Sequence, residues 1–289
     1  MRTFPISVLV LFLPVFAAAA SLELVPSSIG TGEVALLEYR GESPAVAVGR
    51  FQGDVFFMTP GDEGASALVG VDVAADPGDY PLRLAVTDRQ GRTDFYEVPV
   101  PVRPVDRPVE RLTLPRQMVS PTKPAILRRI KREREMLGEI FGRSNGDFEL
   151  APLKLPVSDP VGSPFGLRRV LNGVPKSPHS GVDFRSPRGT PVRAPLDGRV
   201  VFVGDLYYTG GTVILDHGGG LHTYYAHLRT LGAELGDYVG RGETIGTVGS
   251  TGRSTGPHLH WGTKLRGDRI DPLALRQVLE GKALDADSG

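Results

Sequence analysis

The first stretch of the chain with a clear hydrophobic pattern alternates apolar and polar positions. Every second residue from Tyr80 to Val86 is apolar, residues 88–91 (DRQG) are typical of a turn, and residues 93–98 (TDFYEV) continue as a second β-like run. Because successive side chains of a strand point to opposite faces, this pattern predicts half-buried antiparallel sheet. Similar short runs and turns recur through residues 21–103, which predicts a small β-sandwich of immunoglobulin-like architecture. It contains no cluster of chemically reactive residues, so we expect a structural or docking role.

The pattern changes over residues 104–147, which we interpret as a linker that contains a helix. Five prolines lie between positions 104 and 124 and predict an extended connector. Apolar residues then recur at helical spacing over residues 125–141 and predict an amphipathic helix, with a stripe of Ile126, Ile130, Leu137, Ile140 and Phe141. The basic run at residues 128–134 could touch an anionic wall polymer, but a solvated helix face is the commoner meaning of such a run.

Glycine-punctuated apolar runs dominate the rest of the chain. Short β-like runs occupy residues 190–194, 198–204, 211–216 and 221–228. The three glycines at 218–220 predict a hairpin turn between the last two runs. Residues 148–289 are therefore expected to form a second, all-β domain.

The first twenty residues have the pattern of an export signal. Arg2 precedes an apolar run at residues 6–16, and four alanines at 17–20 offer a cleavage site for signal peptidase. We expect residues 1–20 to be removed and the mature protein to act outside the cytoplasmic membrane, in the periplasm or at the cell wall, without stable membrane insertion. An uncleaved N-terminal anchor is the alternative.

Charge and cysteine content narrow the chemistry. The chain has 33 Lys and Arg and 33 Asp and Glu residues. This balance gives no overall field that would attract nucleic acid or an anionic membrane surface. The chain has no cysteine. Disulfides and a thiolate nucleophile are therefore excluded, and a metal site would need histidine and carboxylate ligands. The sequence does not indicate an oligomeric state.

Two histidines placed one residue apart are the first candidates for chemistry. In a strand His258 and His260 would point to the same face, while Leu259 between them points the opposite way. Two such imidazoles can bind one metal, or one can bind metal while the other handles protons. A polar edge strand with two solvated histidines is the simpler alternative.

A second candidate pair lies upstream, at His179 and Asp183. Pro178 and Gly181 argue against a helix here, so we expect a loop that runs into a strand. Together with one histidine of the later pair, this gives two histidines and one aspartate. Three protein ligands with an open fourth position are the composition of a catalytic zinc site. By itself, His179 could also be a loop histidine that pairs with Asp183.

Three motifs in this order resemble the lysostaphin-like, or LytM-type, family of zinc metallopeptidases. They are Pro178-His-Ser-Gly-Val-Asp183, Tyr225-Ala-His-Leu228 and Gly256-Pro-His-Leu-His-Trp261. Ser163-Pro-Phe-Gly-Leu-Arg168 and Gly249-Ser-Thr-Gly252 support the match, and the similarity covers residues 160–273 or so.

The resemblance implies a fold, a site and a reaction. The C-terminal domain would be a barrel-sandwich hybrid of the lysostaphin type. Zn²⁺ would be held by His179, Asp183 and His260, and His227 and His258 would act beside the metal on protons and on transition-state charge. The reaction would be hydrolysis of peptide bonds in bacterial peptidoglycan, in stems, in their crosslinks or in glycine bridges, by a zinc-activated water.

Two rival functions are weighed against this one. A catalytically inactive relative that binds the wall or activates amidases would be expected to lack metal ligands, and all three are present here. Residues 194–198 and 236–246 also resemble hairpins of biotinyl- and lipoyl-carrier domains, but no lysine lies between 198 and 236 to carry such a group. His217 and His222 flank the predicted hairpin turn and are expected to be structural.

Overall fold

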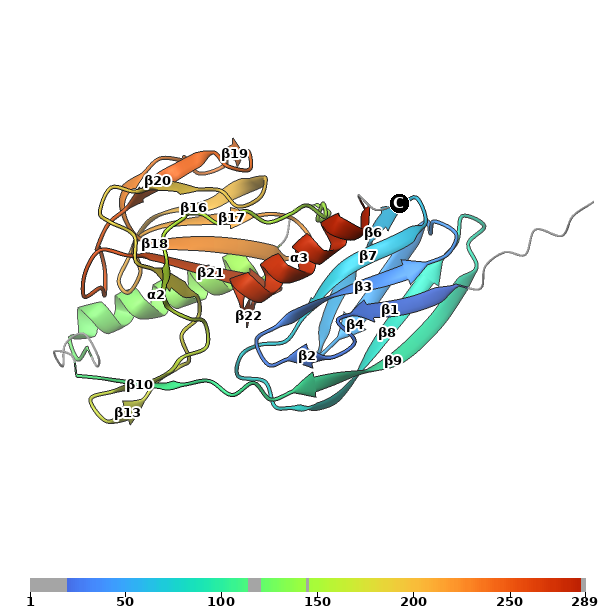
Figure 1. Cartoon of the computed structure of the whole chain (residues 1–289), viewed down its shortest axis with the longest axis horizontal. Coiled ribbons are helices and arrows are strands. Elements are labelled where there is room, and N and C mark those ends of the chain that lie inside the picture. The colour runs from blue at the N-terminus through green and yellow to red at the C-terminus, as the bar shows by residue number, and fades with distance from the viewer. Residues whose placement is uncertain (1–19, 114–120, 144–145, 287–289) are drawn as a thin grey trace, which may run out of the picture.

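The computed structural model describes residues 20–113, 121–143 and 146–286, and the expected export signal lies outside these residues except for Ala20. The fold is mainly β, as predicted (Figure 1). Within the described part of the chain, neither helix combines the length and the apolar content that a membrane span requires.

The N-terminal part is a sandwich of two sheets. The first has the strand order β1-β3-β7-β6 and the second has the order β2-β9-β8-β4-β5. The strands of the first are β1 (Ser21–Val25), β3 (Val34–Arg40), β6 (Thr59–Gly61) and β7 (Gly64–Gly70). Those of the second are β2 (Ile29–Gly30), β4 (Val46–Phe51), β5 (Asp54–Phe57), β8 (Gly78–Thr87) and β9 (Thr93–Arg103).

The hairpin of β8 and β9 shows how the alternating pattern produces this sandwich. Leu82, Leu84 and Val86 are buried between the sheets, and Arg83 between them is exposed on the opposite face. In the turn, the carboxylate of Asp88 accepts hydrogen bonds from the backbone N–H groups of residues 90 and 92. Such capping of a turn by aspartate fixes the register of the strands that follow.

The linker contains a strand as well as the predicted helix. β10 (Val109–Leu112) pairs in parallel with β12 (Arg168–Leu171), and β13 (Val174–Pro175) completes this small sheet. Helix α2 (Pro124–Phe141) has a proline in its first turn, where no backbone N–H is required. The C-terminal half of its predicted apolar stripe, with Leu137, Ile140 and Phe141, packs against the sheet of the C-terminal part, and Ile126 and Ile130 are partly buried.

The C-terminal part is built on one large sheet with the strand order β11-β14-β21-β18-β17-β16-β19, joined by β15, β20 and β22. The glycines at 218–220 connect β17 to β18, as predicted. The strands are β11 (Val161–Ser163), β14 (Val182–Phe184), β15 (Pro191–Arg193), β16 (Gly198–Leu206), β17 (Gly210–Asp216), β18 (Leu221–Leu231), β19 (Tyr238–Val239), β20 (Thr244–Val248), β21 (Leu259–Leu265) and β22 (Asp268–Ile270).

The expectation that the C-terminal domain is all-β is wrong, because the chain ends in helix α3 (Pro272–Ala286). The sequence does contain a start signal for this helix. The carboxylate of Asp271 accepts a hydrogen bond from the backbone N–H of Leu273, and Pro272 occupies the first turn. Leu275 and Leu279, four residues apart, are buried. Two buried leucines are a short apolar stripe, and a stripe of this length does not by itself predict a helix.

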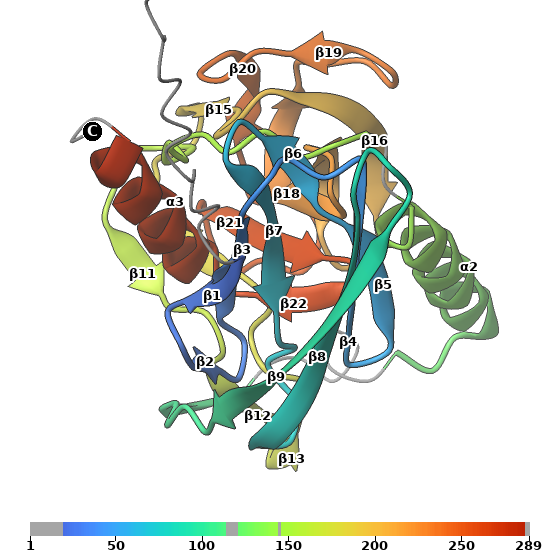
Figure 2. The same ribbon diagram turned by 90° about the vertical axis from the view of Figure 1, so that its right-hand side faces the viewer.

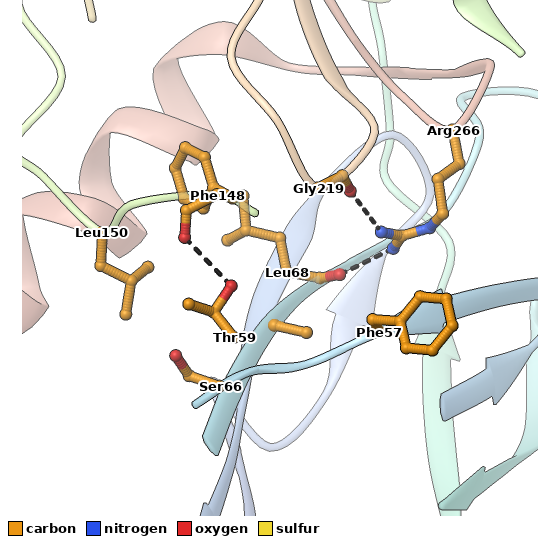
Figure 3. Close-up of a pocket in the computed structure, with 9 residues that line it drawn as sticks. Phe57, Thr59, Ser66, Leu68, Phe148, Leu150, Gly219 and Arg266 are labelled. Carbon is orange, nitrogen blue, oxygen red and sulfur yellow. Dashed lines mark hydrogen bonds between the residues drawn. The ribbon is translucent and has the colours of Figure 1, made fainter. Parts of the chain in front are cut away.

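Helix α3 lies between the two parts of the molecule in Figure 1, and Figure 2 shows it along one side. The two parts share a buried core. Val34, Leu36 and Leu68 of the sandwich belong to the same buried cluster as the C-terminal sheet and α3. Arg266 donates a hydrogen bond across the junction to the carbonyl of Leu68 at 2.7 Å, and a second one within the C-terminal part to the carbonyl of Gly219 at 3.0 Å (Figure 3). The cavity beside Arg266 has a volume of only about 10 Å³, so the two parts are closely packed.

Candidate metal centre

Strand pairing brings together residues that are far apart in the sequence. β14 pairs antiparallel with β21 so that Asp183 lies opposite His260. Directly opposite residues share a face of the sheet, so the two side chains meet. The neighbours of Asp183 in β14, Val182 and Phe184, are buried on the opposite face and fix the register.

His179 reaches the same point from the loop that precedes β14. Its backbone exchanges hydrogen bonds with Gly166 and Leu167, and its ring Nδ1–H donates to the carbonyl of Pro164 at 2.9 Å. Because Nδ1 is the donor, the lone pair of the neutral ring is on Nε2. The ring is almost completely buried.

The three side chains point at a common centre. Asp183 Oδ1 is 3.0 Å from His179 Nε2 and 2.7 Å from His260 Nδ1, and the two nitrogens are 3.0 Å apart. All three potential ligand atoms lie within 4.8 Å of one another. The structure therefore brings together the three residues that the sequence analysis selected as ligands.

The chemistry of this donor set fits zinc. Two imidazole nitrogens and one carboxylate oxygen, with a fourth position open, are the ligands of many zinc enzymes. In a tetrahedral site with zinc–ligand distances of about 2.0–2.2 Å, ligand atoms lie roughly 3.4 Å apart. The three atoms here would need to separate by only about half an ångström.

Burial and hydrogen bonding set the charge of this cluster. Burial by itself would raise the pKa of Asp183, but hydrogen bonds with His179 and His260 outweigh it and hold the pKa well below its ordinary value. Burial also lowers the pKa of His260. Asp183 is therefore ionised, as a carboxylate ligand must be, and metal binding would displace any proton that the two facing ring nitrogens share with it.

The hydroxyl of Tyr224 faces Nε2 of His260, while Nδ1 of the same ring faces Asp183. This hydroxyl is 3.4 Å from His260 Nε2 and donates a hydrogen bond to the carbonyl of Ser180 at 2.8 Å. Burial raises the pKa of Tyr224 to about 12, so the hydroxyl stays neutral. An oxygen that faces Nε2 favours the tautomer of His260 with a proton on Nε2, which leaves the lone pair of Nδ1 toward Asp183.

His227 lies on the same side of the sheet as His260, and simple strand alternation does not predict this. The sequence pattern places His227 with Thr223 and Tyr225, but these two residues are buried in the core. Along β18 the partner of Val213 is Tyr225 and that of Gly211 is Leu228, so β18 has one extra residue. His227 lies in this bulge, with a positive φ of 60°. The alternating pattern therefore assigns His227 to the wrong face of β18, because a bulge changes the direction of its side chain.

The bulge turns the His227 ring toward the centre. Its ring centroid is 4.6 Å from that of His258 and 6.1 Å from that of His260. The Nδ1–H of His227 donates to the carbonyl of Thr251 at 2.7 Å. Burial, with His260 and His258 nearby, lowers the pKa of His227 to about 3. The ring is therefore neutral near pH 7, with a lone pair on Nε2 that can accept a proton.

His258 stands at the more open side of the centre. Its Nε2 is 4.0 Å from Asp183 Oδ1, and its Nδ1–H donates to the carbonyl of Gly256 at 2.9 Å. Leu259 is buried on the opposite face, as the alternating pattern predicted. His227 and His258 thus lie side by side, next to the three potential ligands.

His217 and His222 lie away from this centre. His217 is held between the carbonyl of Asp197 and the hydroxyl of Thr223, both at 2.7 Å. His222 lies against Phe141 of α2, with ring centroids 5.5 Å apart. Both are buried in packing positions, which agrees with a structural role.

Arg169 is a neighbour of the centre that the sequence analysis missed. One of its terminal nitrogens is 3.4 Å from Asp183 Oδ2. The supporting motif at residues 163–168 ends one position before Arg169, and nothing in the local pattern distinguishes Arg169 from Arg168. Tyr224 likewise lies outside the Tyr225-Ala-His-Leu228 motif, and nothing in the local pattern distinguishes it from its neighbours in the strand.

Gly181 shows why the first motif contains a glycine. A Cβ at this position would lie 2.4 Å from the carbonyl oxygen of Trp261 and 2.8 Å from the His260 ring. No side chain fits between β14 and β21 at this point. The close approach of the two strands, and with it the Asp183–His260 contact, depends on this glycine.

Comparison with known proteins gives consistent matches. The model of the family described as Peptidase family M23 matches residues 177–272, which include all five histidine and aspartate residues of the centre. The DD-carboxypeptidase/endopeptidase Mpg of Neisseria meningitidis is 41% identical over 133 residues, which are 46% of this chain and 30% of that protein. The peptidoglycan DD-endopeptidase ShyA of Vibrio cholerae is 37% identical over 140 residues, 47% of this chain and 32% of that protein. The chain thus spans about a third of the length of these curated relatives.

One solved structure resembles almost the whole chain. It is a protein of Pseudomonas aeruginosa assigned to peptidase M23, with 31% sequence identity and a TM-score of 0.67. The match covers 86% of this chain and 95% of the other. The similarity therefore extends beyond the motifs.

Proposed function

Because this chain belongs to peptidase family M23, we propose that it is a zinc metalloendopeptidase that hydrolyses peptide bonds of bacterial peptidoglycan. The observation that carries the proposal is the convergence of His179 Nε2, Asp183 Oδ1 and His260 Nδ1, with His227 and His258 beside them. The names of the two curated relatives, both endopeptidases, support a peptide bond in the bacterial wall as the target.

Each residue has a task that its contacts suit. His179, Asp183 and His260 would hold the metal through the three atoms that converge. Zinc bound there would lower the pKa of water toward about 7 and polarise the scissile carbonyl. His227 and His258 would take up and return protons and stabilise negative charge on the reacting peptide. The carbonyls of Thr251 and Gly256 hold the Nδ1–H groups of these two rings, so that Nε2 is the basic position of each neutral ring.

The test of the function combines metal content with substrate cleavage. We expect one zinc ion per chain by elemental analysis and release of smaller muropeptides from purified sacculi by mass spectrometry. Asp183→Ala should lose both properties, because three ligands leave no redundancy. The identity of the released muropeptides would show whether the bond lies in a stem, a crosslink or a glycine bridge.

Two results would contradict this proposal. A folded protein without zinc after reconstitution would refute the assignment of the metal. A protein that binds zinc and sacculi but releases no muropeptide would favour the alternative of an inactive wall-binding or amidase-activating relative.

Export across the cytoplasmic membrane is a further part of the proposal. It rests on Arg2, the apolar run at residues 6–16 and the alanines at 17–20, and it would place the enzyme in the periplasm or at the cell wall. N-terminal sequencing of the mature protein should therefore begin near Ser21. A membrane-bound product that retains Met1 would support the anchor instead.

A further inference from the structure

Arg169 joins the candidate metal centre to the linker. Its Nε is 3.1 Å from Oε2 of Glu110, and one terminal nitrogen is 3.4 Å from Oδ2 of Asp183. The side chain of Arg169 is 26% exposed, that of Glu110 28% and that of Asp183 14%. The guanidinium thus lies between two carboxylates at the half-buried edge of the centre.

The two oxygens of Asp183 have different surroundings. Oδ1 faces the nitrogens of His179 and His260, at 3.0 and 2.7 Å, and Oδ2 faces Arg169. A carboxylate can bind a metal through one oxygen or through both. A second bond from the same carboxylate would occupy the position that a catalytic site keeps open.

We propose that Arg169, held by Glu110, is a positioning residue that engages Oδ2 of Asp183 and so leaves only Oδ1 for the metal. This inference rests on the proposed function, since it assumes that Asp183 is a metal ligand. It goes further by assigning a role to two residues outside the three motifs.

Strand pairing explains how Glu110 comes to this place. β10 runs parallel to β12, with Glu110 in register with Arg169. The backbone N–H of Arg168 also donates to the carbonyl of Pro108 at 3.0 Å. The linker therefore contributes a strand whose side chain orients Arg169, and a guanidinium with its fixed fork of donors can serve two carboxylates at once.

The same linker also touches the loop that holds His179. The guanidinium of Arg107 lies 5.7 Å from the ring centre of Phe165 and donates to the carbonyl of Thr31 in the sandwich. Phe165 is next to Pro164, whose carbonyl accepts the hydrogen bond from His179 Nδ1. The linker thus supports both ligands of the first motif, and through Arg107 it connects them to the sandwich.

The test replaces zinc by Co²⁺ in the full-length protein and in single variants. Four-coordinate Co²⁺ absorbs visible light more strongly than five-coordinate Co²⁺, so the spectrum reports the number of ligands. In Arg169→Met, Asp183 is free to bind through both oxygens, and we expect the absorption to fall ~2-fold or more. Peptidase activity on sacculi should fall about 10–100-fold, the usual effect of removing a residue that orients a ligand.

Glu110→Gln retains the arginine but removes the charge that holds it, and provides a second, milder variant if Arg169→Met fails to fold. We expect the same spectral change in Glu110→Gln, but smaller. Glu97→Gln is the matched control, since Glu97 pairs with Arg83 across two strands of the sandwich at 2.6 Å, far from the centre in the sequence and in the fold. It should keep the spectrum and the activity of the unchanged protein.

The outcomes separate this inference from the proposed function. If the unchanged protein binds neither Zn²⁺ nor Co²⁺, the proposed function fails and the inference with it. Suppose that the unchanged protein binds metal, but that the Co²⁺ spectra of Arg169→Met and Glu110→Gln are the same as its own. The inference alone is then overturned. A loss of activity without a spectral change also overturns it, because Arg169 would then act on the substrate and not on Asp183.

Discussion

Hydrogen-bond partners fix the position of the proton on several buried histidines, and His217 is the clearest case. Its Nδ1–H donates to the carbonyl of Asp197, and its Nε2 accepts from the hydroxyl of Thr223, which also contacts the hydroxyl of Tyr225. The neutral ring therefore has a partner at both nitrogens. A second proton would place a charge in a fully buried site.

This arrangement predicts a loss of stability in acid. Burial lowers the pKa of His217 to about 4, against about 6.5 in the unfolded chain. The unfolded chain thus takes up the proton first. The contribution of His217 is complete above pH 6.5 and is lost as the pH falls toward 4, by up to about 3 kcal/mol.

Urea unfolding of His217→Gln and of the unchanged protein between pH 7 and pH 4 would measure this effect. Both proteins should be studied with the metal chelated, so that loss of zinc does not contribute. The free energy of unfolding of His217→Gln should depend less on pH. Equal slopes would mean that other groups cause the acid sensitivity.

The bulge in β18 is the feature of a single element that matters most for the centre. The extra residue at His227 turns one imidazole out of the core and toward His258. Its backbone N–H donates to the carbonyl of Thr209 at 2.7 Å, which holds the bulge in place. His222, five residues earlier on the same strand, packs against Phe141 of α2.

We therefore predict different effects of replacing these two histidines. His227→Ala should keep zinc but lose activity by about 10²–10⁴-fold, the usual contribution of a positioned acid–base group. His222→Ala should lower stability modestly and keep most of the activity. Because His227 has a positive φ, His227→Asn is a useful second variant, since asparagine tolerates this backbone conformation better than alanine.

Activity on sacculi, zinc content and thermal unfolding of all three variants would provide the test. If His222→Ala and His227→Ala lose activity to the same extent while fold and zinc content are unchanged, the assignment of His227 is wrong.

Local patterns explain which elements could be predicted from the sequence. The β8–β9 hairpin and the turn at residues 218–220 follow from alternation and turn residues, because both are short-range features. The bulge at His227 was not predictable from alternation, since the extra residue is defined only by pairing with β17. Helix α3 has a local start signal at Asp271 and Pro272, but its short apolar stripe gives only a weak helical pattern.

The same distinction applies to the centre. His179, Asp183, His227, His258 and His260 were selected from motifs, and the structure brings all five together. Arg169 and Glu110 were not selected, because they are 59 residues apart and meet only through the parallel pairing of β10 and β12. Tertiary contacts of this kind leave no periodic pattern in one sequence.

At the scale of the whole molecule, the sandwich is fixed to the C-terminal part by polar contacts as well as by the shared core. Arg269 binds the carboxylate of Asp72 through two nitrogens, and its backbone carbonyl accepts a hydrogen bond from Val73. The backbone N–H of Asp271 donates to the carbonyl of Gly32 at 2.7 Å. Since these contacts join β22 and the start of α3 to loops of the sandwich, the two parts form one unit.

The parallel pairing of β10 with β12 has a consequence for the design of fusion proteins that carry the candidate metal centre. A fragment cut just ahead of α2 would carry every histidine and aspartate of the centre. It would nevertheless leave behind Glu110, which pairs with Arg169 beside Asp183, and Arg107, which lies over Phe165 in the loop that holds His179. A fragment that keeps all the contacts of the candidate centre is therefore longer than the motifs, and its N-terminal boundary belongs ahead of Arg107.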